Sequence, residues 1–195
     1  MEYQVRIDIF ESMTKEMMRC KNVDYGDIIY YGNGYIPIAG GEDGHMALTY
    51  RRLTENELET FIQMRISQLR EEGAEEDIDL RPSLRDYYHR HMSDGTFVSW
   101  IALDGEKIVG TSGMSFVEKP PYFGCPSGKM GLLSSMFTDK AYRRQGIAKE
   151  LLSRVVEEAR NYGCGTVQIT ASDMGVLLYT DFGFVKNGNF MQYNL

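Results

Sequence analysis

Apolar side chains recur at helical spacing along the chain, most clearly between Gly146 and Gly163. The apolar positions there are Ile147, Leu151, Leu152, Val155, Val156 and Ala159. This spacing follows the 3.6-residue period of an amphipathic helix, and a glycine after the last apolar residue is typical of a helix C-terminus. We also expect helices over residues 58–69 and 82–92, and a short helix over 174–183.

The helix predicted over 58–69 carries a start signal. Thr54 and Glu57 have the spacing of a capping box, in which the hydroxyl and the carboxylate satisfy backbone N–H groups that lack a partner within the helix. Leu53 and Leu58 have the spacing of a hydrophobic staple. The sequence therefore predicts that this helix begins just after Thr54.

Alternating or continuous apolar runs predict strands after residue 46. These are ALTYRRL (47–53), TFVSWIAL (96–103), EKIVGTSGMSFVE (106–118), KMGLLSSMFT (129–138), TVQIT (166–170) and NFMQYNL (189–195). Asp104-Gly105 separates the second run from the third and is a strong hairpin signal, because a type I′ turn needs positive φ at both central positions. Strands and helices in this order predict an α/β fold on a mixed sheet, with an α+β arrangement of its elements.

Residues 1–45 form a separate pattern. They end in a glycine-rich acidic stretch, GGEDGH, and the pattern restarts at Met46, so we expect an N-terminal α/β extension before a domain over residues 46–195. YQVRIDIF is expected to form a strand, SMTKEMMRC a short helix, and DIIYYGNGYIPI a hairpin turning at Asn33-Gly34, with Pro37 on an edge strand. The extension could be an accessory lobe, an arm that mediates formation of a homodimer, or a packing layer without separate activity.

Composition narrows the function. The 195 residues carry a formal net charge of −7, which argues against the basic face that nucleic acid or an anionic membrane would require. No apolar run reaches the ~18 residues of a membrane span, and the N-terminus lacks a secretory signal pattern. The cysteines are odd in number and far apart, and with the histidines they make no zinc spacing, so we expect a cytoplasmic protein without disulfides or a metal. They are Cys20, Cys125 and Cys164.

Basic residues gather where the strand predicted over 129–138 leads into the helix at Gly146. They are Lys140, Arg143, Arg144 and Lys149. The first N–H groups of a helix have no internal acceptor and face outward at the positive end of the helix dipole, which makes them an anion site. Gly146 and Ala148 keep large side chains away, so a diphosphate could approach the backbone closely. The P-loop and Rossmann fingerprints are absent.

Two motifs in this part of the chain resemble those of one family. MFTDKAYRRQGIA (136–148) is similar to motif A of the GNAT acetyltransferase superfamily, R/Q-x-x-G-x-G/A, and ASDMGVLLYTDFGF (171–184) is similar to motif B. The resemblance covers about residues 46–195 and implies the GNAT-like acyl-CoA N-acyltransferase fold. It implies that acetyl-CoA lays its diphosphate on the helix N-terminus and its pantetheine arm along the strand. The residues so implied are Met136, Phe137, Thr138, Arg143, Arg144, Gln145, Gly146, Ile147 and Ala148.

The same resemblance implies the chemistry. A primary amine, on a small molecule or a protein, would attack acetyl-CoA directly in a ternary complex. The N–H of Phe137 would stabilise the oxyanion, and Tyr179 would protonate the leaving thiolate. The pKa of a lysine-like amine lies ~3.4 units above pH 7, so presenting the amine neutral costs roughly 4.6 kcal/mol, which favours a base. The candidates are Glu118, Asp173, His91, and Ser134 or Ser135 through water.

Other interpretations stay open. Tyr179 could be a core aromatic residue, because two phenylalanines follow it closely. The whole fold could serve as a non-catalytic acyl-CoA-binding sensor or interaction module. Cys125 is expected to be a spectator thiol, and the loop over 118–129 is expected to form a wall of the acceptor site. The acidic stretch 71–79 is interpreted as a solvated surface without a function.

Overall fold

The computed structural model describes residues 28–31, 34–37, 48–75, 77–188 and 191–193. The chain divides into two compact units, Met1–Ala47 and Leu48–Leu195. In the first unit, β1 (Ile28–Tyr31) and β2 (Gly34–Pro37) pair antiparallel, as predicted. Gly34 is a strand residue opposite Tyr31, so it lies in β2 and not in the turn where the sequence predicted it. The strand and the helix predicted before it lie outside the described residues.

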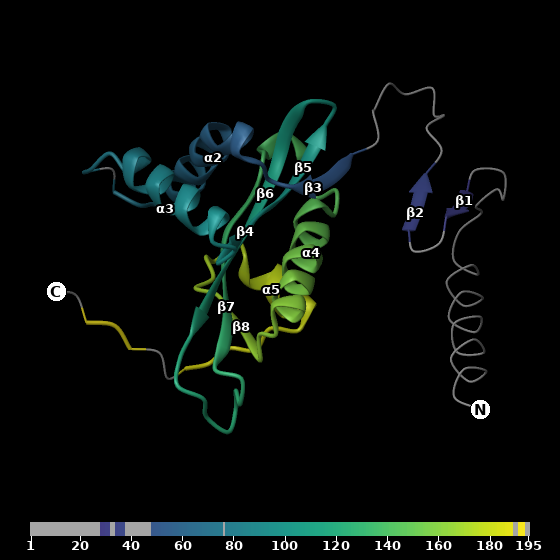
Figure 1. Ribbon diagram of the computed structural model, residues 1–195. Coiled ribbons are helices and arrows are strands. Elements are labelled where there is room, and N and C mark those ends of the chain that lie inside the picture. Colours follow the sequence, from purple (N-terminus) through teal and green to yellow (C-terminus); the bar gives the residue numbers. More distant parts are fainter. Residues whose placement is uncertain (1–27, 32–33, 38–47, 76, 189–190, 194–195) are drawn as a thin grey trace, which may run out of the picture. The chain divides into compact units, whose positions relative to one another are not determined.

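The second unit is built on a six-stranded sheet (Figure 1). Its strands are β3 (Thr49–Arg52), β4 (Phe97–Val98), β5 (Trp100–Asp104), β6 (Lys107–Glu118), β7 (Lys129–Thr138) and β8 (Thr166–Gln168). The order in the sheet is β3-β5-β6-β7-β8, and β4 also pairs with β6. Neighbouring strands are antiparallel except β7 and β8, which are parallel because the helix α4 (Ile147–Tyr162) crosses over between them. This mixed sheet confirms the predicted fold class.

Helices cover both faces of this sheet (Figure 1). On one face lie α2 (Leu58–Glu71) and α3 (Arg81–Ser93), whose Phe61 and Tyr88 rings meet edge to face with their centroids 4.9 Å apart. On the other face lie α4 and α5 (Val176–Phe182). Phe61 is fully buried, so its replacement by alanine would cost about 3–5 kcal/mol of unfolding free energy. Two apolar layers thus hold the sheet between the helices.

The predicted helix between Gly146 and Gly163 is confirmed as α4. All six of its predicted apolar residues are buried against the sheet. Gly146 caps the start with a φ of 82°, and Gly163 caps the end with a φ of 87°, a conformation that glycine adopts without a steric penalty. The chain therefore turns sharply into and out of this helix, which matters for the site described below.

The predicted capping box and the predicted β5–β6 hairpin both form, but the helix start and the turn type differ from the prediction. The Glu57 carboxylate accepts hydrogen bonds from both the N–H and the hydroxyl of Thr54, but the first turn is a 3-10 helix, η2 (Glu55–Glu57), so α2 starts at Leu58. The β5–β6 hairpin forms, yet Asp104 pairs with Lys107, so Gly105-Glu106 connects the strands. Only the glycine of that pair has positive φ, 59°, which excludes the predicted type I′ turn.

The strand predicted over 189–195 is wrong where the structure describes it. Residues 191–193 have no strand geometry, and the side chains of Met191 and Tyr193 are 92% and 87% exposed. An alternating pattern indicates strand propensity, but a strand also needs a partner edge and a buried face. β8 and α5 are likewise shorter than the predicted runs, at Thr166–Gln168 and Val176–Phe182.

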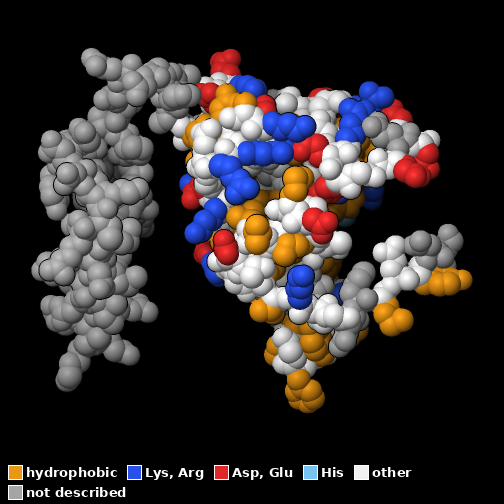
Figure 2. Space-filling view, turned by 180° about the vertical axis from the view of Figure 1, so that it is seen from behind, with side chains coloured by type: hydrophobic (Ala, Val, Ile, Leu, Met, Phe, Trp, Pro, Cys, Tyr) orange, Lys and Arg blue, Asp and Glu red, His pale blue; other side chains and the backbone are white. Residues whose placement is uncertain are grey.

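The connection between β6 and β7 forms an extended tip (Figure 1). Figure 2 shows hydrophobic side chains at this far end of the hairpin, where Phe123 is completely exposed and Tyr122 is half exposed. Cys125 is buried beneath them, and its thiol contacts the Lys129 carbonyl oxygen at 3.4 Å. The predicted role of this loop in acceptor binding stays a prediction.

Candidate active site

The outer edge of β7 is open along its second half. β7 pairs with β8 only at positions 130–132, and no other described strand pairs with that edge before Thr138. On its inner edge β7 carries one extra residue relative to β6, because Phe137 pairs with Thr111 whereas Ser134 pairs with Gly113. Ser135 lies in this bulge with a φ of 52°, which is unusual for a residue other than glycine. The bulge separates the paired half of β7 from the open half.

Buried hydrogen bonds hold the bulge in place. The Thr111 hydroxyl donates to the Ser135 carbonyl oxygen at 2.9 Å, and the hydroxyl oxygens of Tyr88 and Ser135 lie 3.2 Å apart. Ser135 and Thr111 are each 1% exposed. A strained φ persists only where the surroundings impose it. The open edge is therefore a built feature of the strand.

The direction of the β7 amides corrects one sequence prediction. The Asp139 N–H donates to the Val109 carbonyl oxygen of the β6 side at 2.9 Å. Amide direction alternates along a strand, so the N–H of Phe137 also points toward β6, and the N–H groups of Met136 and Thr138 point to the open edge. Phe137 is thus wrong as the oxyanion donor, because its amide is already used in the sheet.

Thr138 ends the open edge and has one polar atom without a partner. Its hydroxyl oxygen is fully buried and makes no hydrogen bond with any described residue. Its carbonyl oxygen accepts a hydrogen bond from Nε of Arg143 at 2.9 Å. A buried hydroxyl left unsatisfied costs about 1–3 kcal/mol, and such a group calls for an explanation such as a ligand. An ordered water or a ligand atom beside Thr138 would satisfy this hydroxyl.

The turn from β7 into α4 exposes backbone amides. Arg144 and Gly146 both have positive φ, 65° and 82°, and the N–H of Glu150 makes the first bond of the helix, to the Gly146 carbonyl oxygen. The amides of residues 147–149 therefore have no intrahelical acceptor. A Cβ atom built on Gly146 would meet nothing within 4 Å, so the space in front of these amides is open. The turn thus has the open amides that the sequence predicted, and their role as an anion site stays a prediction.

The basic side chains divide into two pairs. The Arg143 guanidinium turns back toward α2, where Nη2 lies 2.5 Å from the Glu71 carboxylate, and the Lys140 ammonium lies 3.6 Å from the same group. The Arg143 side chain is therefore already paired with Glu71, and its predicted contact with a bound anion stays a prediction. Arg144 and Lys149 have no ion pair with any described residue, so their charge is available at the helix start.

Tyr179 lies on α5 with its ring in the core and its hydroxyl at the surface of the site. The side chain is 7% exposed and packs on Phe184, with the ring centroids 5.7 Å apart. The hydroxyl has no hydrogen-bond partner among the described residues, yet it is not a fully buried atom, so it reaches open space. Burial and, less strongly, the charge of Glu72 raise the pKa of Tyr179 to about 12. The phenol thus keeps its proton at neutral pH.

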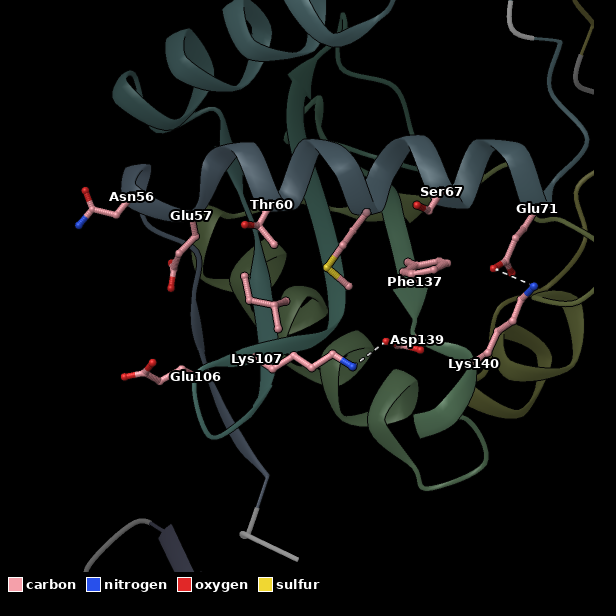
Figure 3. A pocket seen from close by; sticks show the side chains of 12 residues that line it. Asn56, Glu57, Thr60, Ser67, Glu71, Glu106, Lys107, Phe137, Asp139 and Lys140 are labelled. Atoms are coloured by element: carbon pink, nitrogen blue, oxygen red, sulfur yellow. Dashed lines mark ion pairs between the residues drawn. The ribbon is translucent and has the colours of Figure 1, made fainter.

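A cavity of about 660 Å³ lies on the other side of Glu71 (Figure 3). Its roof is one side of α2, and its floor holds the Phe137 ring between the Lys107–Asp139 and Lys140–Glu71 ion pairs. Tyr179 and the α4 amides do not line it. The cavity is therefore separate from the open edge of β7, although Phe137 borders both.

No hydrogen bond or ion pair joins a predicted base to Tyr179 among the described residues. Glu118 pairs with Lys129 at the far end of β7, eight residues or about 26 Å along the strand from Phe137. Nδ1 of His91 lies 2.6 Å from the Thr96 hydroxyl, and the His91 ring packs on Tyr87. The Ser135 hydroxyl contacts the Tyr88 hydroxyl within the bulge. Asp173 is exposed in the turn before α5.

The open strand edge, the bulge and the unpaired helix N-terminus lie in the segment where the sequence resembles an acyltransferase. The chain belongs to the acetyltransferase (GNAT) family, whose pattern residues 58–184 match. This confirms the resemblance of the two motifs.

Curated proteins of similar sequence support this assignment to the family. The chain is 35% identical to rat N-acetyltransferase 8B over 115 residues, which are 57% of this chain and 50% of the relative. It is 33% identical to human N-acetyltransferase 8 over 119 residues, which are 57% of this chain and 49% of the relative. The chain thus spans about half the length of these curated relatives.

Solved structures share the fold. A predicted acetyltransferase from Clostridium acetobutylicum, crystallised with acetyl-CoA, is 28% identical with a TM-score of 0.74, over 76% of this chain and 96% of that one. A GCN5-related N-acetyltransferase from Ralstonia eutropha JMP134 is 23% identical with a TM-score of 0.69, over 76% and 99% of the two chains, which shows the fold alone.

Among the described residues, no helix is long and apolar enough to cross a membrane. The same residues contain no group of three or more His, Cys, Asp or Glu side chains placed to hold a metal ion.

Sequence reasoning missed three features of the site. The Tyr88–Ser135 contact and the positive φ of Ser135 have no local sequence signal. Glu72 was included in an acidic stretch without a function, although two glutamates at the end of a helix oppose the helix dipole, and this pattern could have drawn attention to them.

Proposed function

We propose that residues 46–195 form an N-acetyltransferase domain that transfers the acetyl group of acetyl-CoA to a primary amine. One observation carries the proposal: the open edge of β7 ends at a buried, unpaired Thr138 hydroxyl and continues into the unpaired amides of α4. An acetyl-CoA complex of a 28% identical structure supports the identity of the donor. Residues 1–45 would be an extension outside this chemistry.

The open features fit acetyl-CoA in two places. The N–H groups of Met136 and Thr138 and the Thr138 hydroxyl offer hydrogen bonds to the amide groups of a pantetheine arm lying along the edge. The amides of residues 144–148, with Gln145 exposed among them, offer a cradle for a diphosphate at the positive end of the helix dipole. The Arg144 and Lys149 side chains add positive charge. Bound there, acetyl-CoA supplies an activated thioester carbonyl.

The chain's own groups fit the remaining steps. A neutral amine nitrogen attacks the thioester carbon, and the Met136 N–H at the open edge can donate to the oxygen that becomes negative. The carbon–sulfur bond then breaks, the amine loses a proton to water, and the Tyr179 hydroxyl gives its proton to the sulfur. The pKa of Tyr179, raised to about 12, keeps the phenol protonated at neutral pH. It also lies above the pKa of a thiol, near 8.5, so the phenol is the weaker acid of the two. After the transfer, water returns a proton to the phenolate.

Release of free thiol from acetyl-CoA with a panel of primary amines tests this function. Amine-dependent release supports the transferase. Acetyl-CoA binding in calorimetry without release for any amine would support the alternative, an acyl-CoA-binding sensor. The acceptor as a small molecule or a protein, the cytoplasmic location, the homodimer, and the lack of nucleic-acid or membrane partners are further proposals that rest on sequence.

A further inference from the structure

The 3-10 turn η3 (Lys140–Tyr142) connects the end of β7 to the turn before α4, and it is fastened from two sides. On one side the Tyr142 hydroxyl donates to the Asp104 carboxylate at 2.7 Å. The Lys107 ammonium lies 3.1 Å from the carboxylate of Asp139, the residue before η3. Because Asp104 and Lys107 border the β5–β6 turn, that end of the sheet holds this side of η3.

Glu71, in the last turn of α2, holds the other side. Its two carboxylate oxygens contact different cations, Oε2 at 2.5 Å from Nη2 of Arg143 and Oε1 at 3.6 Å from the Lys140 ammonium. Lys140 is the first residue of η3, and Arg143 is the residue directly after it. The Glu71 side chain is 22% exposed and that of Arg143 33%, so solvent screens their contact only in part. One carboxylate thus ties both ends of η3 to α2.

The Arg143 guanidinium makes three contacts at the end of β7. Nε donates to the Thr138 carbonyl oxygen at 2.9 Å, and Nη2 donates to Glu71. Its central carbon lies 5.8 Å from the centroid of the Phe137 ring. A guanidinium has the planar fork of donors that makes the first two contacts at once, whereas a lysine ammonium is a single point of charge. The Arg143 side chain is therefore fastened to the strand and to the helix together.

The strained part of the turn begins at the next residue. Arg144 has a φ of 65°, which is uncommon for a residue other than glycine, and Gly146 follows with a φ of 82°. Such a conformation persists only where the surrounding structure imposes it. The contacts of Arg143 lie directly before this strain, and the open amides of α4 lie directly after it. The Glu71–Arg143 contact is thus placed to hold the shape of the turn.

We propose that Glu71 and Arg143 are positioning residues, whose ion pair holds the turn before α4 in the shape that presents its amides to the diphosphate of acetyl-CoA. The Arg143 guanidinium does not itself bind the diphosphate in this account. The inference rests on the proposed function. The competing account makes Arg143 a diphosphate ligand that Glu71 holds back. The two accounts predict opposite effects of removing the Glu71 carboxylate.

Calorimetry with acetyl-CoA, well below the unfolding temperature of each variant, tests the proposal. Glu71→Gln should weaken binding about two- to fivefold, the worth of one partly exposed ion pair. Glu75→Gln is the matched control, because it removes the same charge from an exposed carboxylate four residues further on, and it should not weaken binding. Stronger binding by Glu71→Gln would overturn the proposal, since it would mean that Glu71 competes with the diphosphate for Arg143.

Substitutions of Arg143 separate its geometry from its charge. Arg143→Lys keeps the positive charge but loses the fork, so it should weaken binding about as much as Arg143→Gln does. The double variant Glu71→Gln/Arg143→Gln should bind as Arg143→Gln alone does, because both substitutions remove the same contact. Near wild-type affinity in Arg143→Lys, or losses that add in the double variant, would contradict the positioning role.

Salt dependence provides a readout that a loss of fold stability alone would not change. The double variant keeps the net charge of the protein, so salt should weaken its acetyl-CoA binding as steeply as it does in the wild type, and less steeply in Arg144→Gln. A shallower dependence in the double variant would show that Arg143 contacts the diphosphate and would overturn the proposal. Failure of the wild-type protein to bind acetyl-CoA would overturn the proposed function and this inference with it.

Discussion

The hydroxyl oxygens of Tyr88 on α3 and Ser135 on β7 lie 3.2 Å apart inside the protein. Ser135 has a φ of 52°, so this contact holds a strained residue at the point where β7 leaves its neighbour. Burial of the Tyr88 ring raises the pKa of its hydroxyl, which therefore stays protonated at neutral pH. A helix on one face of the sheet thus helps to shape the strand edge at which acetyl-CoA is proposed to bind.

Tyr88→Phe should lower the unfolding free energy by about 1–3 kcal/mol, because it leaves a buried serine hydroxyl without its partner. Tyr87→Phe is the matched control, since its hydroxyl contacts Ser115, which is only partly buried, at 2.8 Å. Urea unfolding measures both. If the bulge depends on Tyr88, acetyl-CoA affinity should also fall more in Tyr88→Phe than in Tyr87→Phe. Equal losses in the two variants would count against that role.

Local patterns were enough to predict the elements that carry the site. The spacing of apolar residues predicted α4, and Gly146 predicted the sharp turn at its start, whose role as an anion site stays a prediction. These features depend on residues close together in the chain. The geometry of Ser135 could not be predicted in this way, because Tyr88 and Thr111, which hold it, lie 47 and 24 residues away.

The sequence predictions that failed concern features that depend on contact with a strand or residue far away in the sequence. Phe137 was expected to donate to the oxyanion, but amide direction follows from the register with β6, which a single strand sequence does not reveal. The strand expected over 189–195 has suitable alternation, yet its described residues 191–193 are exposed and have no strand geometry. The contact of Arg143 with Glu71 joins residues 72 positions apart, so the sequence alone does not reveal it.

Glu57 should make stability depend on pH in the acidic range. Hydrogen bonds from Arg51 and then from Thr54 lower the pKa of Glu57 from 4.5 to about 2. Because the folded pKa is the lower one, the ionised carboxylate stabilises the fold above pH 4.5, and this contribution is lost as the pH falls toward 2. Arg51 is 46% exposed, so solvent screening reduces the contribution to about 1 kcal/mol.

Glu57→Gln should therefore be less stable than the wild type by about 1 kcal/mol at pH 7 and equal to it near pH 2. Urea unfolding across this range gives the difference at each pH. Glu59→Gln serves as the control, because Glu59 pairs with Arg85 on the exposed side of the same helix and should have the smaller effect. A difference that stays constant from pH 7 to pH 2 would show that the ionised carboxylate is not the cause.

Two substitutions at Gly146 should separate backbone strain from charge. Any side chain at a φ of 82° is strained by roughly 1–2 kcal/mol, so Gly146→Ala and Gly146→Glu should both lose stability by about that amount. The carboxylate of Gly146→Glu would also repel a diphosphate at the helix start, so acetyl-CoA should bind it at least about tenfold more weakly than Gly146→Ala. Calorimetry measures both affinities, and added salt should narrow the gap. Matching affinities would move the diphosphate away from this turn.

Tyr179→Phe should affect the chemistry more than the fold. The phenylalanine keeps the buried ring and its packing on Phe184, and the lost hydroxyl has no partner among the described residues, so thermal stability and acetyl-CoA affinity should change little. General-acid help is typically worth about 10²–10⁴-fold, so kcat should fall by that order with an acceptor amine. Tyr162→Phe is the matched control, because Tyr162 stacks on Phe116 and lies outside the site.

The raised pKa adds a second measurement to this comparison. Since burial and Glu72 hold the pKa of Tyr179 at about 12, its ionisation should cause no fall in the wild-type rate at any pH below ~11. If the hydroxyl instead made only a structural hydrogen bond, Tyr179→Phe would lose about 1 kcal/mol of unfolding free energy and keep its turnover. Full activity in that variant would leave water as the proton donor to the thiolate.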